Sequence, residues 1–86
     1  MKVENMISSK GNKAPDQFLI YTDKGTMFQS YNSNIAFIGK NGKVVLGPKW
    51  DYSNTTGKYR NIFLGETKKE TQAKIDSGEY VIDNNL

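Results

Sequence analysis

The sequence has no cysteine, no histidine and a single arginine among its 86 residues. Without cysteine the chain has no disulfide, no thiolate for a metal and no thiol nucleophile. The lack of histidine removes the commonest general base and the commonest metal ligand. A catalyst of this size would depend on carboxylates, lysine or tyrosine alone, so we expect a non-enzymatic protein without metal or cofactor.

Long apolar runs are also missing. No run approaches the roughly 20 residues of a membrane-spanning helix, and the start of the chain has no hydrophobic stretch of signal-peptide length. We therefore expect a cytoplasmic protein that does not contact a membrane. The length allows one small core, and aromatic residues (five Tyr, four Phe and one Trp) supplement a hydrophobic fraction of 36%.

The charge of +3 is unevenly distributed. Residues 1–60 carry nine Lys and Arg against four acids, while residues 61–86 carry three Lys against five acids. This asymmetry indicates one basic face and one acidic end, and a basic face is a weak indication of a polyanionic partner.

Residues 1–16 are polar and rich in turn-forming residues, which predicts a loosely ordered lead-in with at most a short pairing segment at Met6 and Ile7. Residues 17–86 are then expected to form one domain. The segments 17–22 (QFLIYT) and 26–31 (TMFQSY) predict two strands joined by a turn at 23–25.

The segment NIAFIGKNGKVVLG contains Asn41-Gly42 between two apolar runs, a combination typical of a hairpin with a two-residue type I′ turn. In that register Lys40 faces Lys43 and Ile38 faces Val45. Two opposed lysines at a hairpin tip most simply both point into water.

Two helices are expected in the C-terminal half. Thr55 or Thr56 can cap the first, which runs to Leu64 before Gly65, with an apolar stripe at positions 59, 62 and 63. The second starts with the capping box of Thr67 and Glu70 and ends at Gly78, and residues 79–82 form a last strand. The sequence therefore predicts the α+β class: a small single-layer, mainly antiparallel sheet of four to five strands, with two short helices packed on one face.

The mixture of cationic and aromatic residues around position 50 is the positive functional signal. Lys and Arg neutralise phosphates and aromatic rings stack on bases, which together suit single-stranded nucleic acid. The candidate binding residues are Lys40, Lys43, Lys49, Trp50, Tyr52, Lys58 and Arg60. A helix N-terminus with free N–H groups near Gly57 and Lys58 would add an anion site.

Each of these residues also has a structural interpretation. Trp50 and Tyr52 can belong to the core, together with Tyr59, and the lysines can be ordinary solvated charges. Arg60 can form a salt bridge with Asp51 or Glu66 in place of a ligand contact.

Two stretches of the chain resemble a family of small uncharacterised proteins from bacteriophages, prophages and plasmids. The shared pattern is S-Y-x-[ST]-x-[IV]-A, then W-D-Y-S-x-T-T, then F-L-G. It corresponds here to Ser30, Tyr31, Ser33, Ile35 and Ala36, to Trp50 through Ser53 with Thr55 and Thr56, and to Phe63 through Gly65. The resemblance covers about residues 17–82 and implies an origin in a mobile element, with no established activity to transfer.

Two functions from different classes are compatible with these features. The first hypothesis is a nucleic-acid-binding accessory protein in the cytoplasm of the host cell. The alternative is a protein-directed inhibitor of a host defence enzyme, of the anti-restriction or anti-CRISPR type, which would use the aromatic residues and the acidic end. Exposed sheet edges are also compatible with a homodimer.

Overall fold

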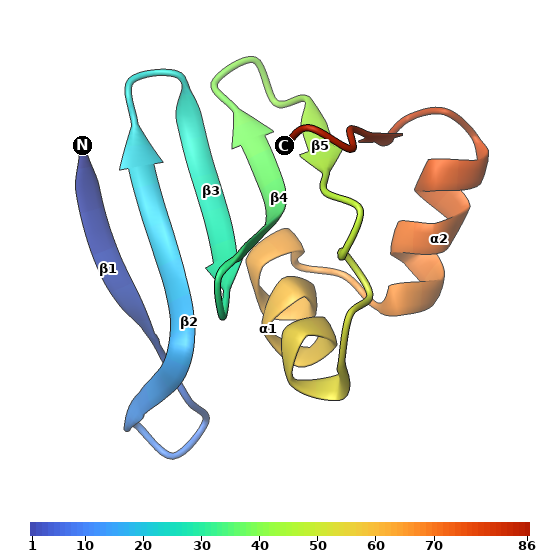
Figure 1. Cartoon of the computed structure of the whole chain (residues 1–86). Coiled ribbons are helices and arrows are strands. Elements are labelled where there is room, and N and C mark those ends of the chain that lie inside the picture. Colours follow the sequence, from blue (N-terminus) through green and yellow to red (C-terminus); the bar gives the residue numbers. More distant parts are fainter.

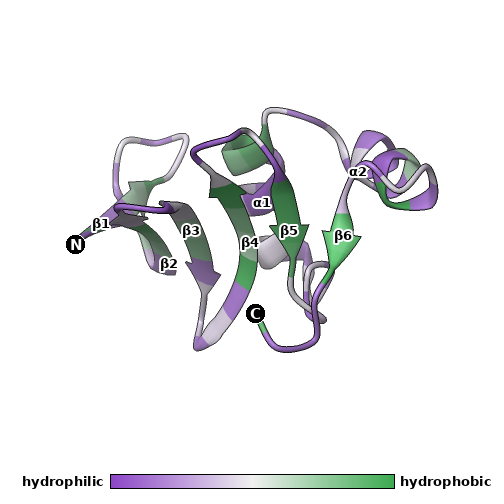
Figure 2. Cartoon of the chain, turned by 90° about the horizontal axis from the view of Figure 1, so that it is seen from above, coloured by the Kyte–Doolittle hydropathy of each residue, from purple (hydrophilic) through white to green (hydrophobic).

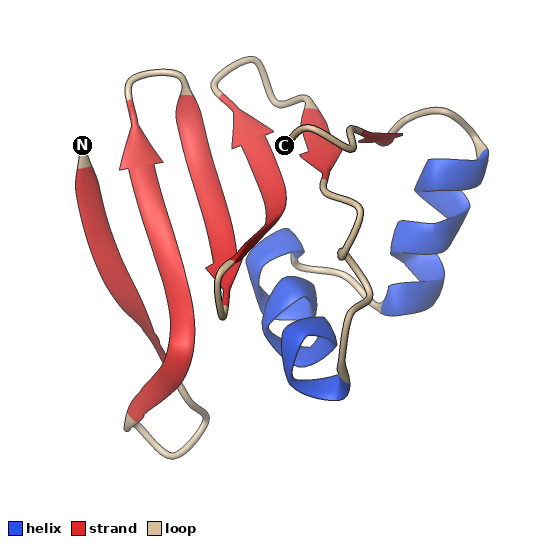
Figure 3. Ribbon diagram, viewed as in Figure 1, coloured by secondary structure: helices blue, strands red, loops and turns tan.

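Six strands form one sheet in the computed structural model, which describes residues 1–86. The strands follow one another across the sheet in chain order, and both helices lie on its β4–β5 side (Figures 1 and 3). The elements are β1 (Lys2–Ile7), β2 (Lys13–Thr22), β3 (Gly25–Ser30), β4 (Ser33–Gly39), β5 (Val44–Leu46), α1 (Asn54–Leu64), α2 (Lys68–Asp76) and β6 (Val81–Ile82). The α+β class is confirmed, but the sheet has six strands where four to five were expected. It is mixed, because β6 runs parallel to β5.

The N-terminal segment is ordered where a loose lead-in was expected. β1 pairs with β2 from Lys2 opposite Tyr21 to Ile7 opposite Lys13, so residues 2–7 form an edge strand. Met6 is buried, and the Asn5 side-chain amide donates to the carbonyls of neighbouring β2. The turn-forming residues of this segment supply only the loop between two strands.

The turn between β4 and β5 differs from the predicted type I′ turn. A type I′ turn needs positive φ at two residues, but only Gly42 has it here, at 84°. The Gly39 N–H donates to the Lys43 carbonyl, and the Lys43 N–H donates to the Asn41 side chain. Gly39 and Lys43 therefore close a three-residue loop with glycine in the left-handed position.

This longer loop shifts the register of the hairpin by one residue. Ile38 pairs with Val44 instead of Val45, so the predicted register was wrong. A shift of one residue moves each side chain to the opposite face of a sheet. Val44 consequently packs against the core, and Val45 lies on the other face.

Helix α1 covers the centre of one face of the sheet. The ring centroids of Phe63 and Phe28 are 5.8 Å apart, and the hydroxyls of Thr56 and Ser30 form a buried hydrogen bond of 2.8 Å. The buried apolar residues of the core are Met6, Ala14, Phe28, Ile35, Ala36, Leu46, Tyr59 and Tyr80.

The limits of α1 were only partly predicted. Gly65 ends the helix in the left-handed conformation, as expected, but the N-cap is Ser53, whose hydroxyl accepts from the Thr56 N–H. Ile62, assigned to the apolar stripe, is 56% exposed, because the buried face is formed by Thr56, Tyr59 and Arg60.

Helix α2 begins as the sequence predicts. The capping box of Thr67 and Glu70 is present, and Gly78 follows the helix at φ 83°. The helix lies beyond the β5–β6 edge of the sheet (Figure 2). Neither helix has the length and apolar character that crossing a membrane requires.

Candidate functional site

The candidate residues lie in separate places. Lys40 and Lys43 belong to the loop after β4, whereas Lys49 and Tyr52 line a hollow together with Ser33, the first residue of β4. Seven residues of strand at about 3.3 Å each separate the two ends by roughly 20 Å. The fold therefore does not bring the seven residues to one surface.

Arg60 lies inside the molecule, with 1% of its surface exposed. Its Nη1 donates to the Trp50 carbonyl at 2.7 Å and lies 3.4 Å from an Asp51 carboxylate oxygen, and its Nη2 donates to the Asn61 side chain. Its guanidinium also lies 5.1 Å from the centre of the half-buried Trp50 ring. This is the structural interpretation of Arg60, with Asp51 as the partner, and it removes Arg60 and Trp50 from the candidate surface.

Asp51 joins this cluster to helix α2. Lys68 forms an ion pair with Asp51 at 2.7 Å. The hydrogen bond from Lys68, with a further one from Arg60, outweighs partial burial and holds the pKa of Asp51 below its ordinary value. The Trp-Asp segment therefore connects the start of α1 to α2.

The N-terminus of α1 offers fewer free donors than the sequence suggested. Gly57 is buried, and its N–H donates to the Ser53 carbonyl at 2.8 Å. Lys58 is exposed, and its ammonium lies 5.5 Å from the centre of the Tyr59 ring. Lys58 thus lies on α1 itself, outside the hollow that Lys49 and Tyr52 line.

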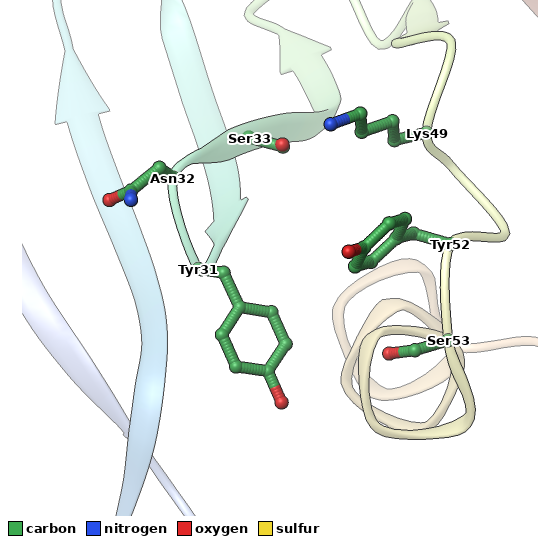
Figure 4. Close-up of a pocket in the computed structure, with 6 residues that line it drawn as sticks. All are labelled: Tyr31, Asn32, Ser33, Lys49, Tyr52 and Ser53. Atoms are coloured by element: carbon green, nitrogen blue, oxygen red, sulfur yellow. The ribbon is translucent and has the colours of Figure 1, made fainter.

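A polar hollow between the β3–β4 turn and the segment before α1 is the candidate site, because it brings Lys49 and Tyr52 together. It has a volume of about 430 Å³. Tyr31 and Tyr52 extend into it from opposite segments, 41% and 61% exposed (Figure 4). We call it the tyrosine hollow, and its lining residues are Tyr31, Asn32, Ser33, Lys49, Tyr52 and Ser53.

Lys49 provides the positive charge of the tyrosine hollow. Its ammonium is 5.2 Å from the centre of the Tyr52 ring, a cation–π distance, and it has no carboxylate within ion-pair distance. A second hollow of about 250 Å³ adjoins the first and shares Asn32, Ser33 and Lys49 with it. The lysine therefore stands over a continuous polar surface.

Tyr31 is held in an unfavourable backbone conformation. Its φ is 56°, in the left-handed region that bulky residues rarely occupy, and its N–H donates to the Asp16 carbonyl at 2.7 Å. Residues kept in such conformations are concentrated at binding and catalytic sites. The turn thus holds an aromatic ring at the hollow where glycine or asparagine would fit the backbone better.

Glu66 is the one carboxylate whose side chain is almost fully buried, at 4% exposure. Burial opposes its ionisation, but hydrogen bonds from Lys74, Thr71 and Tyr80 outweigh it and lower the pKa of Glu66. A carboxylate with a lowered pKa is a poorer general base. Glu66 lines none of the hollows, and its contacts tie α2 and Tyr80, just before β6, to the turn after α1.

Sequence reasoning identified Lys49 and Tyr52 but missed the opposite wall of the hollow, formed by Tyr31, Asn32 and Ser33. Tyr31 was assigned to the end of a strand. The available signal was the run Ser-Tyr-Asn-Ser-Asn, because a cluster of Ser and Asn between two apolar segments is typical of a turn.

A family model described as "Family of unknown function (DUF8033)" matches residues 1–79. This agrees with the expectation of an uncharacterised family and extends to the N-terminal strand. Neither a curated protein nor a solved structure matches the chain.

Proposed function

The chain belongs to a family of unknown function, DUF8033, so a proposal for its function has to come from the site itself. We propose that the protein binds single-stranded nucleic acid in the tyrosine hollow. In this proposal a base stacks on the rings of Tyr31 and Tyr52, and Lys49 contacts a neighbouring phosphate. The protein acts as a non-enzymatic accessory factor in the host cytoplasm. Its origin in a phage, prophage or plasmid rests on the resemblance of the two sequence stretches alone.

The observation that carries the proposal is the pair of exposed tyrosines beside an unpaired lysine. Base stacking needs aromatic faces that solvent can reach, and Tyr59 and Tyr80 are buried in the core. Asn32 and Ser33 add donors and acceptors that can bond to base edges in an unpaired strand. Duplex DNA would hide its base faces from such a hollow.

Titration of a labelled oligothymidine and a labelled oligouridine, followed by fluorescence anisotropy, tests the proposal. Stacking contributes about 1–3 kcal/mol per base, so Tyr52→Ala should weaken binding roughly 5- to 150-fold. With one or two phosphates contacted, a roughly fourfold rise in salt should weaken binding only about three- to sevenfold. No binding of either oligonucleotide at micromolar protein and low salt would refute the proposal.

Lys49→Ala and Lys69→Ala form a matched pair for the same titration. Both remove one positive charge from an exposed lysine, but Lys69 lies on α2, away from the hollow. We expect Lys49→Ala to weaken binding and flatten its salt dependence, with little effect from Lys69→Ala. Equal effects would indicate a response to net charge alone, without a defined site.

A protein-directed inhibitor of a host defence enzyme is the second candidate function. The exposed Tyr31 and Tyr52 favour it too, because tyrosine is enriched at the centres of protein interfaces. Competition with an unlabelled oligonucleotide separates the two candidates. An excess of oligonucleotide displaces a bound host protein from the tyrosine hollow only if nucleic acid binds to the same residues.

A further inference from the structure

One apolar residue from each strand lies in a continuous row across the sheet. Directly paired residues share a face, so the ladder contacts connect the whole row. We call the surface around this row the open face, and its members, in strand order, are Val3, Ile20, Met27, Phe37, Val45 and Val81.

The open face lies opposite helix α1. Phe28 and Ser30 contact α1, and Met27 precedes Phe28, so its side chain points to the other side. No member of the row belongs to the core or packs against it. Val3 and Val81, at its two ends, are each 57% exposed, and the four residues between them are half-buried. The row is therefore an apolar surface without a partner in this chain.

The open face is large enough for a specific contact. Five steps between neighbouring strands, at about 4.8 Å each, give a row roughly 24 Å long. Figure 2 shows that β4 and β5, which contribute Phe37 and Val45 to the row, consist mostly of apolar residues. A contiguous apolar surface that solvent can reach often marks an interaction site, because leaving it in water is unfavourable.

Three lysines border the open face on the side of the β2–β3 and β4–β5 turns. Lys24, Lys40 and Lys43 surround a hollow of about 440 Å³ whose floor includes Phe37 and Val45. None of the three has a carboxylate within ion-pair distance. With Asp23 in the same turn, this side remains net positive.

The paired residues of the open face include no carboxylate. The single acid in the ladders is Glu4, and it pairs with Leu19 on the face that carries α1. A second copy of the chain packed on this face would thus bring no carboxylate from its own ladder residues to the lysines. The charges favour a different molecule.

We propose that the open face docks a protein partner that presents aliphatic side chains next to carboxylates. Its apolar groups cover the row around Met27, and its acids pair with Lys24, Lys40 and Lys43. Nucleic acid fits this surface less well, because five of the six residues in the row are not aromatic and give bases nothing to stack on. The proposal uses residues outside the tyrosine hollow and does not depend on nucleic-acid binding.

Selection of random dodecapeptides displayed on phage, with the folded full chain as bait, tests this inference. We expect the selected peptides to combine Asp or Glu with neighbouring aliphatic residues. Their binding should fall about tenfold or more with Met27→Glu, which places in the apolar contact a charge that the acids of the peptide repel. Lys40→Glu combined with Lys43→Glu should weaken binding several-fold and reverse its salt dependence, because the lysine side of the face becomes net negative. Tyr52→Ala should leave binding unchanged.

Circular dichroism establishes that each variant is folded. The lysine pair is exposed, so the double lysine variant remains informative if Met27→Glu unfolds the chain. Three results would overturn the inference. They are failure to enrich acidic peptides, equal binding of those peptides to both variants and the parent, and a dimer in sedimentation that Met27→Glu dissociates. Changes in the methyl NMR chemical shifts of Ile20 and Met27 on addition of an oligonucleotide would instead assign the face to nucleic acid.

Discussion

The tyrosine hollow and the open face differ in how they are built. The hollow is polar and lies where two loops meet, and one of its tyrosines is held in an unfavourable conformation. The open face is aliphatic and follows directly from the alternation of side chains along six strands. The hollow therefore depends on specific local contacts, while the open face depends only on register.

This difference has a consequence for how each surface tolerates change. A contact built from loops needs a rigid support, and here that support is the cluster of Trp50, Asp51 and Arg60 just before and within α1. A face built from strands is supported by the whole sheet. Substitutions behind the hollow should thus cost more stability than substitutions on the open face.

The largest effect is expected from Arg60→Ala. The change removes a buried guanidinium, leaves the Trp50 carbonyl without its donor and opens a cavity inside the molecule, which together cost about 3–5 kcal/mol. The free energy of unfolding, measured by urea denaturation, should fall by that amount. Lys58→Ala on the exposed side of the same helix is the control, with a change within about 0.5 kcal/mol. A loss below about 1 kcal/mol for Arg60→Ala would show that the hollow needs no such support.

Phe28 and Met27 provide a direct comparison of the two faces of the sheet. Phe28→Ala removes a fully buried ring that contacts Phe63 and should cost about 3–5 kcal/mol. Met27→Ala, on the open face, should cost well under half as much, because its side chain is already partly in water. Urea denaturation of both variants measures the difference, and equal costs would contradict the assignment of the faces.

The sequence predicts the fold class but not the register on which the open face depends. Asn41-Gly42 indicates a hairpin correctly, yet the choice between a two-residue and a three-residue loop is set by whether Asn41 takes positive φ. That choice depends on packing of Val44 against the core, a contact distant in sequence. A short-range pattern therefore gives the hairpin and leaves its two faces undetermined.

The hollow was predictable only in part, for a different reason. The aromatic and cationic residues near position 50 stand out by composition, but burial separates them: Tyr52 is exposed and Arg60 is not. Residue type alone cannot show which of these side chains the fold buries and which it leaves in solvent. Tyr31 comes from another part of the chain, and only the fold brings it to Tyr52 (Figure 4).

An intermediate effect is expected at Glu66, which supports neither surface directly. Its pKa is lowered in the folded state, so its contribution to stability is present above the pKa of the unfolded chain and is lost as pH falls through the folded value. Stability should therefore decrease below about pH 5. Glu66→Gln should cost roughly 1–3 kcal/mol at neutral pH and make stability less dependent on pH in the acid range.

Urea denaturation at several pH values checks this, with Glu70→Gln as the control, since Glu70 is exposed in the capping box of α2. Because Asp51 also has a lowered pKa, some acid dependence should remain in the Glu66→Gln variant. An unchanged pH profile in Glu66→Gln would show that the buried cluster does not govern the acid response.

The smallest effect on stability is expected at Tyr31, and its sign is the informative part. Tyr31→Gly relieves the left-handed conformation, a strain of about 1–2 kcal/mol, against a loss of chain entropy of roughly 0.5–1 kcal/mol, so the free energy of unfolding should rise slightly. The same change removes one wall of the hollow and should weaken binding of the oligothymidine. Tyr31→Phe retains both the ring and the strain, and should leave both quantities near those of the parent. If the ring served only the fold, its removal would lower both stability and binding, so a rise in stability with a fall in binding assigns the ring to binding. A loss of stability in Tyr31→Gly would instead assign the tyrosine to the fold and leave Tyr52 as the only stacking residue of the hollow.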